Sequence, residues 1–298
     1  MADSSSENKH NSNKTNYQLL LISNLKKEIE MARKLDPEKL AAEIRKIGFS
    51  CQQCGKCCRQ VCGDNRVFIL PSEIKKICKF TGLSNLEVAE PFVPYELSPG
   101  ELVRLKEKKV EIEGRNEDNP DKLLRDSEEK KDLSPETLQN IQAHAKNRSA
   151  KVNESLELPE HLLEDIDSEG NIHAFGWILR RKRDGDCIFL QENSNKCRIY
   201  PSRPMLCSTY PFFIEDLSLK ICECEGLSHP ISVKDSVELA KLLVFRYISE
   251  LEDTLALYEK FTDFEKDKTG PELAKNRLKK GICSYVVHDS TGNNKISY

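Results

Sequence analysis

Residues 51–58 read Cys-Gln-Gln-Cys-Gly-Lys-Cys-Cys, which places four cysteines within eight residues. A second group lies far downstream, at Cys187, Cys197 and Cys207. A thiolate is a soft ligand that suits zinc, iron and iron–sulfur clusters, and a two-residue spacer lets two sulfurs face one ion. Two such clusters in one chain therefore indicate a metal site.

The alternative explanation for many cysteines is a disulfide framework, which is typical of small secreted domains. Twelve cysteines in 298 residues are well below the roughly 8–10% of disulfide scaffolds. The segment 1–16 is polar and contains no apolar stretch of signal-peptide or transmembrane type. We therefore predict a cytoplasmic protein with reduced thiols and no membrane association.

Charge and glycine spacing argue against two common classes of function. The net charge is −3 with 32% charged residues, so no basic field favours a nucleic-acid partner. No Gly-x-Gly occurs among the thirteen glycines, which excludes the dinucleotide fingerprint and argues against a nucleotide-driven enzyme.

The pattern of apolar residues predicts an α+β fold, with a small metal-centred core of short strands and hairpins between N- and C-terminal helices. The predicted regions are a disordered tail at 1–16, helices at 17–48, a cysteine-cluster metal-binding domain at 49–226, and a helical region at 227–298. A charged insert at about 115–169 interrupts the metal-binding domain, with fifteen acidic and eight basic residues. The insert or the helical ends could contact a protein partner.

Several elements can be placed more closely. Asp36 and Pro37 mark the start of a helix that ends at Gly48, and Ser84 to Glu87 form a capping box. Asp184-Gly185 predicts a two-residue hairpin with Cys187 on its second strand. Further predictions are strands at 67–70, 210–214, 221–226 and 282–287, and helices at 72–80, 237–258 and 271–279.

Three ordered motifs carry a resemblance to a known family. They are Cys-x2-Cys-Gly-x-Cys-Cys, Asp-Gly-Asp-Cys-Ile-Phe-Leu, and Cys-Arg-Ile-Tyr-Pro-Ser-Arg-Pro-Met-Leu-Cys-Ser-Thr-Tyr-Pro-Phe. Together they resemble the CxxCxxCC family of cysteine-cluster proteins, also called YkgJ-like and described as zinc- or iron-chelating domains. The resemblance covers about residues 49–226.

The resemblance implies a set of metal ligands, namely Cys51, Cys54, Cys57, Cys58, Cys187, Cys197, Cys207 and Cys224. Cys224 is a weaker candidate than the other seven, because Glu225 stands where the family commonly has proline. Cys62 and Cys222 fall outside the pattern, and Cys283 is most simply structural. Arg198 and Arg203 could offset thiolate charge, whereas His173 and His229 lack a zinc-type spacing.

The residues leave the cofactor open between zinc, iron and an iron–sulfur cluster. Cys51, Cys54 and Cys57 reproduce the first three positions of a ferredoxin-type run, but its fourth Cys-Pro element is absent. Successive side chains diverge, so adjacent Cys57 and Cys58 favour more than one metal, or one spare thiol. We expect the two clusters to meet in one site region.

Three functions are compatible with these patterns. The first is a metal-binding protein with a structural or electron-transfer role. The second is an enzyme, because the resemblance includes proteins labelled lysine N-methylases of flagellin. The third is a metal-delivery or adaptor module that uses its helical ends. No catalytic residue can be assigned from the sequence.

Overall fold

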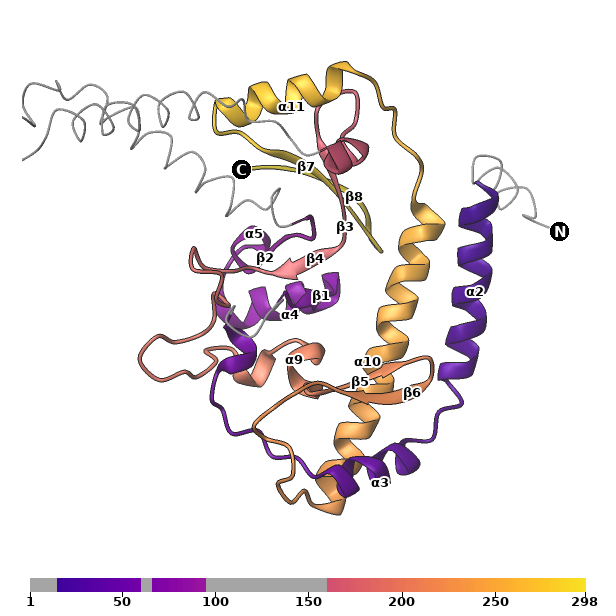
Figure 1. Cartoon of the computed structure of the whole chain (residues 1–298), viewed down its shortest axis with the longest axis vertical. Helices are drawn as coiled ribbons and strands as arrows, with labels where there is room; N and C mark the ends of the chain where they lie inside the picture. The colour runs from indigo at the N-terminus through magenta and orange to yellow at the C-terminus, as the bar shows by residue number, and fades with distance from the viewer. Residues whose placement is uncertain (1–14, 60–65, 95–159) are drawn as a thin grey trace, which may run out of the picture. The chain divides into compact units, whose positions relative to one another are not determined.

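The computed structural model describes residues 15–59, 66–94 and 160–298, and it confirms the α+β class (Figure 1). The α-helices are α2 (Asn16–Ala32), α3 (Pro37–Ile47), α4 (Pro71–Thr81), α5 (Asn85–Val88), α9 (Met205–Thr209), α10 (Val233–Lys260) and α11 (Thr269–Lys279). The 3-10 helices are η1 (Lys56–Cys58), η4 (Glu160–Asp165) and η5 (Tyr200–Ser202). No helix of the described residues has the length and apolar character needed to cross a bilayer. Most of the predicted tail and insert falls outside these ranges.

The strands are short and form small sheets. They are β1 (Phe68–Ile69), β2 (Ala89–Pro91), β3 (Ile172–Phe175), β4 (Trp177–Leu179), β5 (Phe212–Glu215), β6 (Ser218–Ile221), β7 (Ser284–Asp289) and β8 (Gly292–Ser297). One sheet has the order β1-β4-β2, with both pairs antiparallel, and another has the order β3-β7-β8. β5 and β6 form a separate antiparallel hairpin in which Phe212 is opposite Ile221.

The chain divides into two compact units. Among the described residues, the first unit contains 15–59, 66–93, 173–264 and 285–296. The second contains residue 94 and the ranges 160–172, 265–284 and 297–298. Every cysteine predicted as a metal ligand lies in the first unit.

The helix caps predicted from the sequence are present at the N-termini of α3 and α5. The Asp36 carboxylate accepts a hydrogen bond from the Glu38 amide at 2.9 Å and caps α3. At α5 the Ser84 amide donates to the Glu87 carboxylate at 2.8 Å, which closes the capping box. Because these contacts join residues two or three positions apart, the local sequence was sufficient to predict them.

The core of the first unit forms around α10. This helix packs against α2, α3 and β5, and Figure 1 shows α2 beside it. Ile44 of α3 and Ala240 and Leu243 of α10 are almost completely buried, as is Phe212 of β5. The long apolar stripe predicted for 237–258 is thus part of a helix-on-helix core.

Three local predictions need correction. The second strand expected after the Asp184-Gly185 turn does not form, because the Leu190 amide donates back to the Cys187 carbonyl at 3.0 Å. Cys187 therefore has only an isolated bridge to Arg181. The partner of β5 is 218–221 rather than 221–226, since the chain reverses at Asp216 and Leu217. Both of these residues have positive φ. The helical region predicted at 227–298 ends in the β7–β8 hairpin, of which only the first strand was predicted.

Candidate metal centre

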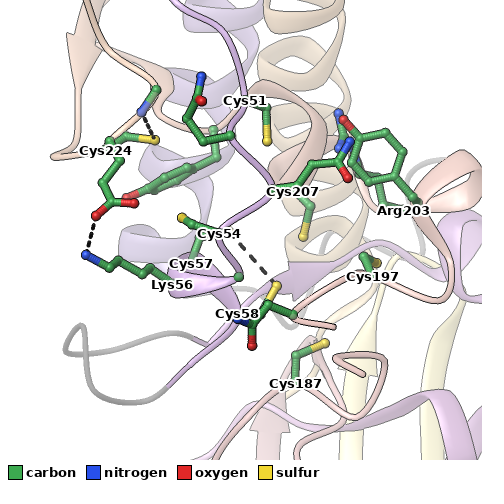
Figure 2. A pocket seen from close by; sticks show the side chains of 18 of the residues that line it. Cys51, Cys54, Lys56, Cys57, Cys58, Cys187, Cys197, Arg203, Cys207 and Cys224 are labelled. Atoms are coloured by element: carbon green, nitrogen blue, oxygen red, sulfur yellow. Dashed lines mark hydrogen bonds and ion pairs between the residues drawn. The ribbon is translucent and has the colours of Figure 1, made fainter. Parts of the chain in front are cut away.

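A cavity of about 730 Å³ collects most of the cysteines of the described chain. Figure 2 shows their side chains around it. Nine cysteines line the cavity: Cys51, Cys54, Cys57, Cys58, Cys187, Cys197, Cys207, Cys222 and Cys224. The fold therefore brings all eight predicted ligands to one cavity.

The ninth lining cysteine, Cys222, was not predicted as a ligand. Its only sequence signal is the Cys-x-Cys spacing to Cys224, and it is exposed. Cys78 on α4 and the buried Cys283 do not line the cavity. Cys62 lies outside the described residues.

The N-terminal end of the first cluster is attached to the segment after β6. Phe49 and Leu227 form an isolated bridge, and the Ser50 amide donates to the Gly226 carbonyl at 2.9 Å. A side chain at position 226 is sterically excluded, because its Cβ would lie 2.5 Å from the Ser50 carbonyl oxygen. This close approach places Cys51 near Cys224.

The C-terminal end of the first cluster is attached to the second cluster. The Cys187 amide donates to the Cys58 carbonyl at 2.8 Å. Arg59 forms an ion pair with Asp186 at 3.2 Å. Gly55 packs so closely that a Cβ would lie 2.9 Å from the Asn195 carbonyl oxygen. Residues far apart in the sequence thus become neighbours at the cavity wall.

Cys197 and Cys207 reach the cavity from a bridge and a short helix. Cys197 forms an isolated bridge with Leu190, and Cys207 lies on α9. The Met205 amide at the start of α9 donates to the Glu73 carboxylate of α4 at 2.7 Å. The sequence predicted a constrained turn before Cys207 but not this helix or its contact with α4.

The thiols of this cavity perturb one another. A hydrogen bond with Cys187 is the largest of the effects that raise the pKa of Cys58 to about 12. Burial raises the pKa of the Cys207 thiol well above its usual value, and Cys58, Cys57 and Cys197 raise it further. A hydrogen bond with Cys58 raises the pKa of the exposed Cys57. Burial and the neighbouring thiols disfavour the thiolate forms of these cysteines, so metal binding would have to displace their protons.

Two cationic side chains line the cavity, and they differ in their partners. Lys56 forms an ion pair with Glu225. The half-buried Arg203 donates to the Ser208 hydroxyl at 3.1 Å, and its guanidinium lies 3.9 Å from the centre of the Tyr200 ring. No carboxylate within the described part of the chain forms an ion pair with Arg203, so its charge is available to the thiols.

The other candidates from the sequence do not line the cavity. Arg198 is exposed and donates to the Ile188 carbonyl at 2.8 Å. His173 Nδ1 lies 2.7 Å from His288 Nε2, and His229 Nδ1 lies 3.0 Å from the Leu227 carbonyl oxygen. Among the described residues, thiols but no histidine line the cavity.

The donor set fits zinc or iron in its chemistry, because both metals accept four thiolates. In their present orientations, no three His, Cys, Asp or Glu side chains of residues 15–59, 66–94 and 160–298 are placed to hold one ion. Cys57 Sγ and Cys58 Sγ are 4.0 Å apart. Two sulfurs on one zinc ion would be about 3.8 Å apart, given bonds of about 2.3 Å. The fold gathers the thiols, and metal binding has to draw them together.

A cavity lined by thiols from two clusters is typical of cysteine-rich metal-chelating domains. The model of the CxxCxxCC family, described as "Putative zinc- or iron-chelating domain", matches residues 126–228, which confirms the resemblance over about a third of the chain. The match includes Cys187, Cys197, Cys207, Cys222 and Cys224 but not the cluster at 51–58. No curated protein and no solved structure matches the chain.

Proposed function

We propose that this chain is a metal-binding protein whose cavity thiolates hold zinc or iron. One observation carries the proposal: the eight predicted ligand cysteines, which come from two distant clusters, line a single cavity. The family match over the downstream cluster supports the same chemistry. All eleven cysteines of the described residues are free thiols, which leaves those of the cavity available as metal ligands.

The metal would act as a cross-link between the two clusters. Only short elements surround the cavity, and a few backbone hydrogen bonds join its walls, such as Cys187 to Cys58. A ligand set drawn from both clusters makes metal binding part of folding, because the unfolded chain has no preformed site. The entropic cost of closing so long a loop rises only with the logarithm of its length.

The role depends on which metal is bound. Zinc has no redox chemistry and would serve as a structural cross-link. An iron–sulfur cluster, held by four thiolates, would add electron transfer to that role. The position of Cys224 beside the Cys-x2-Cys-x2-Cys run supports a cluster, because Cys224 could supply the fourth ligand that the run lacks.

The test is to purify the full chain without oxygen and to measure zinc, iron, acid-labile sulfide and the visible spectrum on one sample. We expect bound metal in the wild type and in the control Cys78→Ser, whose thiol does not line the cavity. The double variant Cys58→Ser/Cys207→Ser should contain less metal. A wild-type chain that binds neither metal would refute the proposal.

A further inference from the structure

We propose that Arg246 of α10 is a positioning residue for Cys207, which it fixes by holding the C-terminal end of α9. Glu73 of α4 holds the other end of the same helix, so Cys207 is in place before a metal ion binds. This inference rests on the proposed metal-binding function and specifies the part of the cavity wall toward which the other thiols move. Neither Arg246 nor Glu73 lines the cavity.

The helix that carries Cys207 is too short to be stable by itself. α9 has five residues, and an isolated helix shorter than about 12–15 residues is marginal in water, because its first turn is costly to form. Its N-cap is Pro204, whose side chain cannot accept a hydrogen bond. Two backbone bonds of 3.0 Å run along it, from the Ser208 amide to the Pro204 carbonyl and from the Tyr210 amide to the Leu206 carbonyl. Contacts from distant parts of the chain must therefore keep α9 folded.

The N-terminal end of α9 is tied to α4. The Met205 amide has no partner within its own helix, and it donates to the Glu73 carboxylate at 2.7 Å. The second oxygen of this carboxylate accepts a hydrogen bond from the Leu70 amide at 3.1 Å. Because both oxygens have backbone partners, the carboxylate has a fixed orientation at the start of α4.

The C-terminal end of α9 is tied to α10, which packs against both α9 and β5 (Figure 1). Thr209 is completely buried. Its hydroxyl donates to the Met205 carbonyl at 2.9 Å and accepts a hydrogen bond from Nη1 of Arg246. The same nitrogen donates to the Phe212 carbonyl of β5 at 3.4 Å. One guanidinium thus joins the end of α9 to the start of β5.

Arg246 is itself held firmly. Its Nε donates to the Glu250 carboxylate at 2.8 Å, one turn further along α10, and its side chain is only 11% exposed. A guanidinium is planar and points its donors in fixed directions, and hydrogen bonds from a charged donor are stronger than neutral ones. The position of α9 is therefore set by the helix that forms the apolar core.

This arrangement gives the thiol cavity one fixed wall. In the described residues, no three potential ligands are yet placed to hold one ion, so some thiols have to move when metal binds. The wall at Cys187 is joined to Cys58 by a backbone hydrogen bond, whereas the helix of Cys207 is tied to two longer helices. Residues that orient metal ligands typically contribute 10–100-fold to metal affinity.

The first test needs no metal. Hydrogen-exchange mass spectrometry is applied to the reduced, metal-free full-length chain, and the amides of residues 205–210 are followed. We expect them to be protected in the wild type and in Leu243→Ala, which destabilises the core without touching the clamp. Protection should be lost in Thr209→Val and in Arg246→Gln/Glu250→Gln, where the second change avoids an unpaired carboxylate. Exposed amides in the metal-free wild type, or protected ones in both variants, would overturn the inference.

The second test measures zinc affinity by competition with a chromophoric chelator. Thr209→Val and Arg246→Gln/Glu250→Gln should each bind zinc at least about tenfold more weakly than the wild type, and Leu243→Ala should bind it equally well. The same weakening in Leu243→Ala would show that general stability, rather than the position of Cys207, limits metal binding. A wild-type chain that binds neither zinc nor iron would refute the proposed function, whereas the exchange experiment tests the clamp on α9 independently.

Discussion

The helical core and the thiol cavity of the first unit are held together by different means. In the core, α10 buries Ala240 and Leu243 against α2, α3 and β5, and this apolar burial stabilises the fold by itself. At the cavity, the walls are short elements joined by isolated bridges and single hydrogen bonds. The comparison suggests that the core folds without metal and that the cavity needs it.

The two regions meet at Phe49, just before the first cluster. Its ring lies 5.5 Å from the ring of Phe212 in an edge-to-face contact, and Phe212 belongs to the helical core. The core therefore fixes the N-terminal end of the first cluster, whereas its C-terminal end depends on the contact between Cys58 and Cys187.

Removing the metal should produce the largest difference between the helical core and the thiol cavity. Structural zinc in small fingers contributes on the order of 10–16 kcal/mol, so its loss should open the cavity walls. We expect the Cys187 amide, at the end of the cluster that the core does not fix, to exchange hydrogen rapidly after chelation, while the Leu243 amide stays protected. Hydrogen-exchange mass spectrometry with and without chelator measures this, and an equal loss of protection in both regions would contradict the comparison.

Truncating a buried side chain of the helical core should have the opposite effect, because it should lower the stability of the core without removing metal. Leu243 is 1% exposed, so Leu243→Ala should lower the free energy of unfolding by about 2–5 kcal/mol. The number of bound metal ions should not change. Phe245→Ala on the same helix is the control, because that side chain is 61% exposed and its loss should cost less than about 0.5 kcal/mol. Metal loss in Leu243→Ala, seen by elemental analysis, would show that the regions depend on each other.

A substitution at Gly226 tests the backbone pairing between Ser50 and Gly226 at the wall of the thiol cavity. Gly226→Ala would bring a Cβ to 2.5 Å from the Ser50 carbonyl oxygen, which should cost about 1–3 kcal/mol. It should also weaken zinc binding at the Cys224 end. Gly82→Ala is the matched control: its Cβ would meet nothing within 4 Å, and only its positive φ adds strain. Competition with a chromophoric chelator measures zinc affinity, which should be unchanged in the control.

The smallest expected effect concerns the cation beside the thiols. Arg203 offsets thiolate charge near Cys197 and Cys207, so Arg203→Gln should weaken metal binding about tenfold, the low end for residues that support metal ligands. Arg198→Gln should change the affinity less, because the exposed Arg198 side chain donates to a backbone carbonyl instead. If the two substitutions weakened metal binding equally, Arg203 would have no special role in supporting the thiolates.

Local signals in the sequence predicted the local structure well. The caps at Asp36 and Ser84 and the apolar stripe of α10 depend on residues a few positions apart, and the structure confirms them. The expected strand at Cys187 was wrong, because the Asp184-Gly185 signal describes a turn but not how far its strands continue. The helix that carries Cys207 was missed, since its start is stabilised by Glu73 from a distant helix.

The sequence by itself determined the thiols that could serve as soft ligands, their two clusters and the helices on either side. Covalent geometry also led us to expect that the Cys57 and Cys58 side chains diverge, but their sulfurs lie 4.0 Å apart in the structure. Only the tertiary structure decided which thiols are neighbours, bringing Cys224 to Cys51 and Cys187 to Cys58. These proximities arise from backbone pairing and side-chain packing between distant segments, which spacing along the chain does not encode.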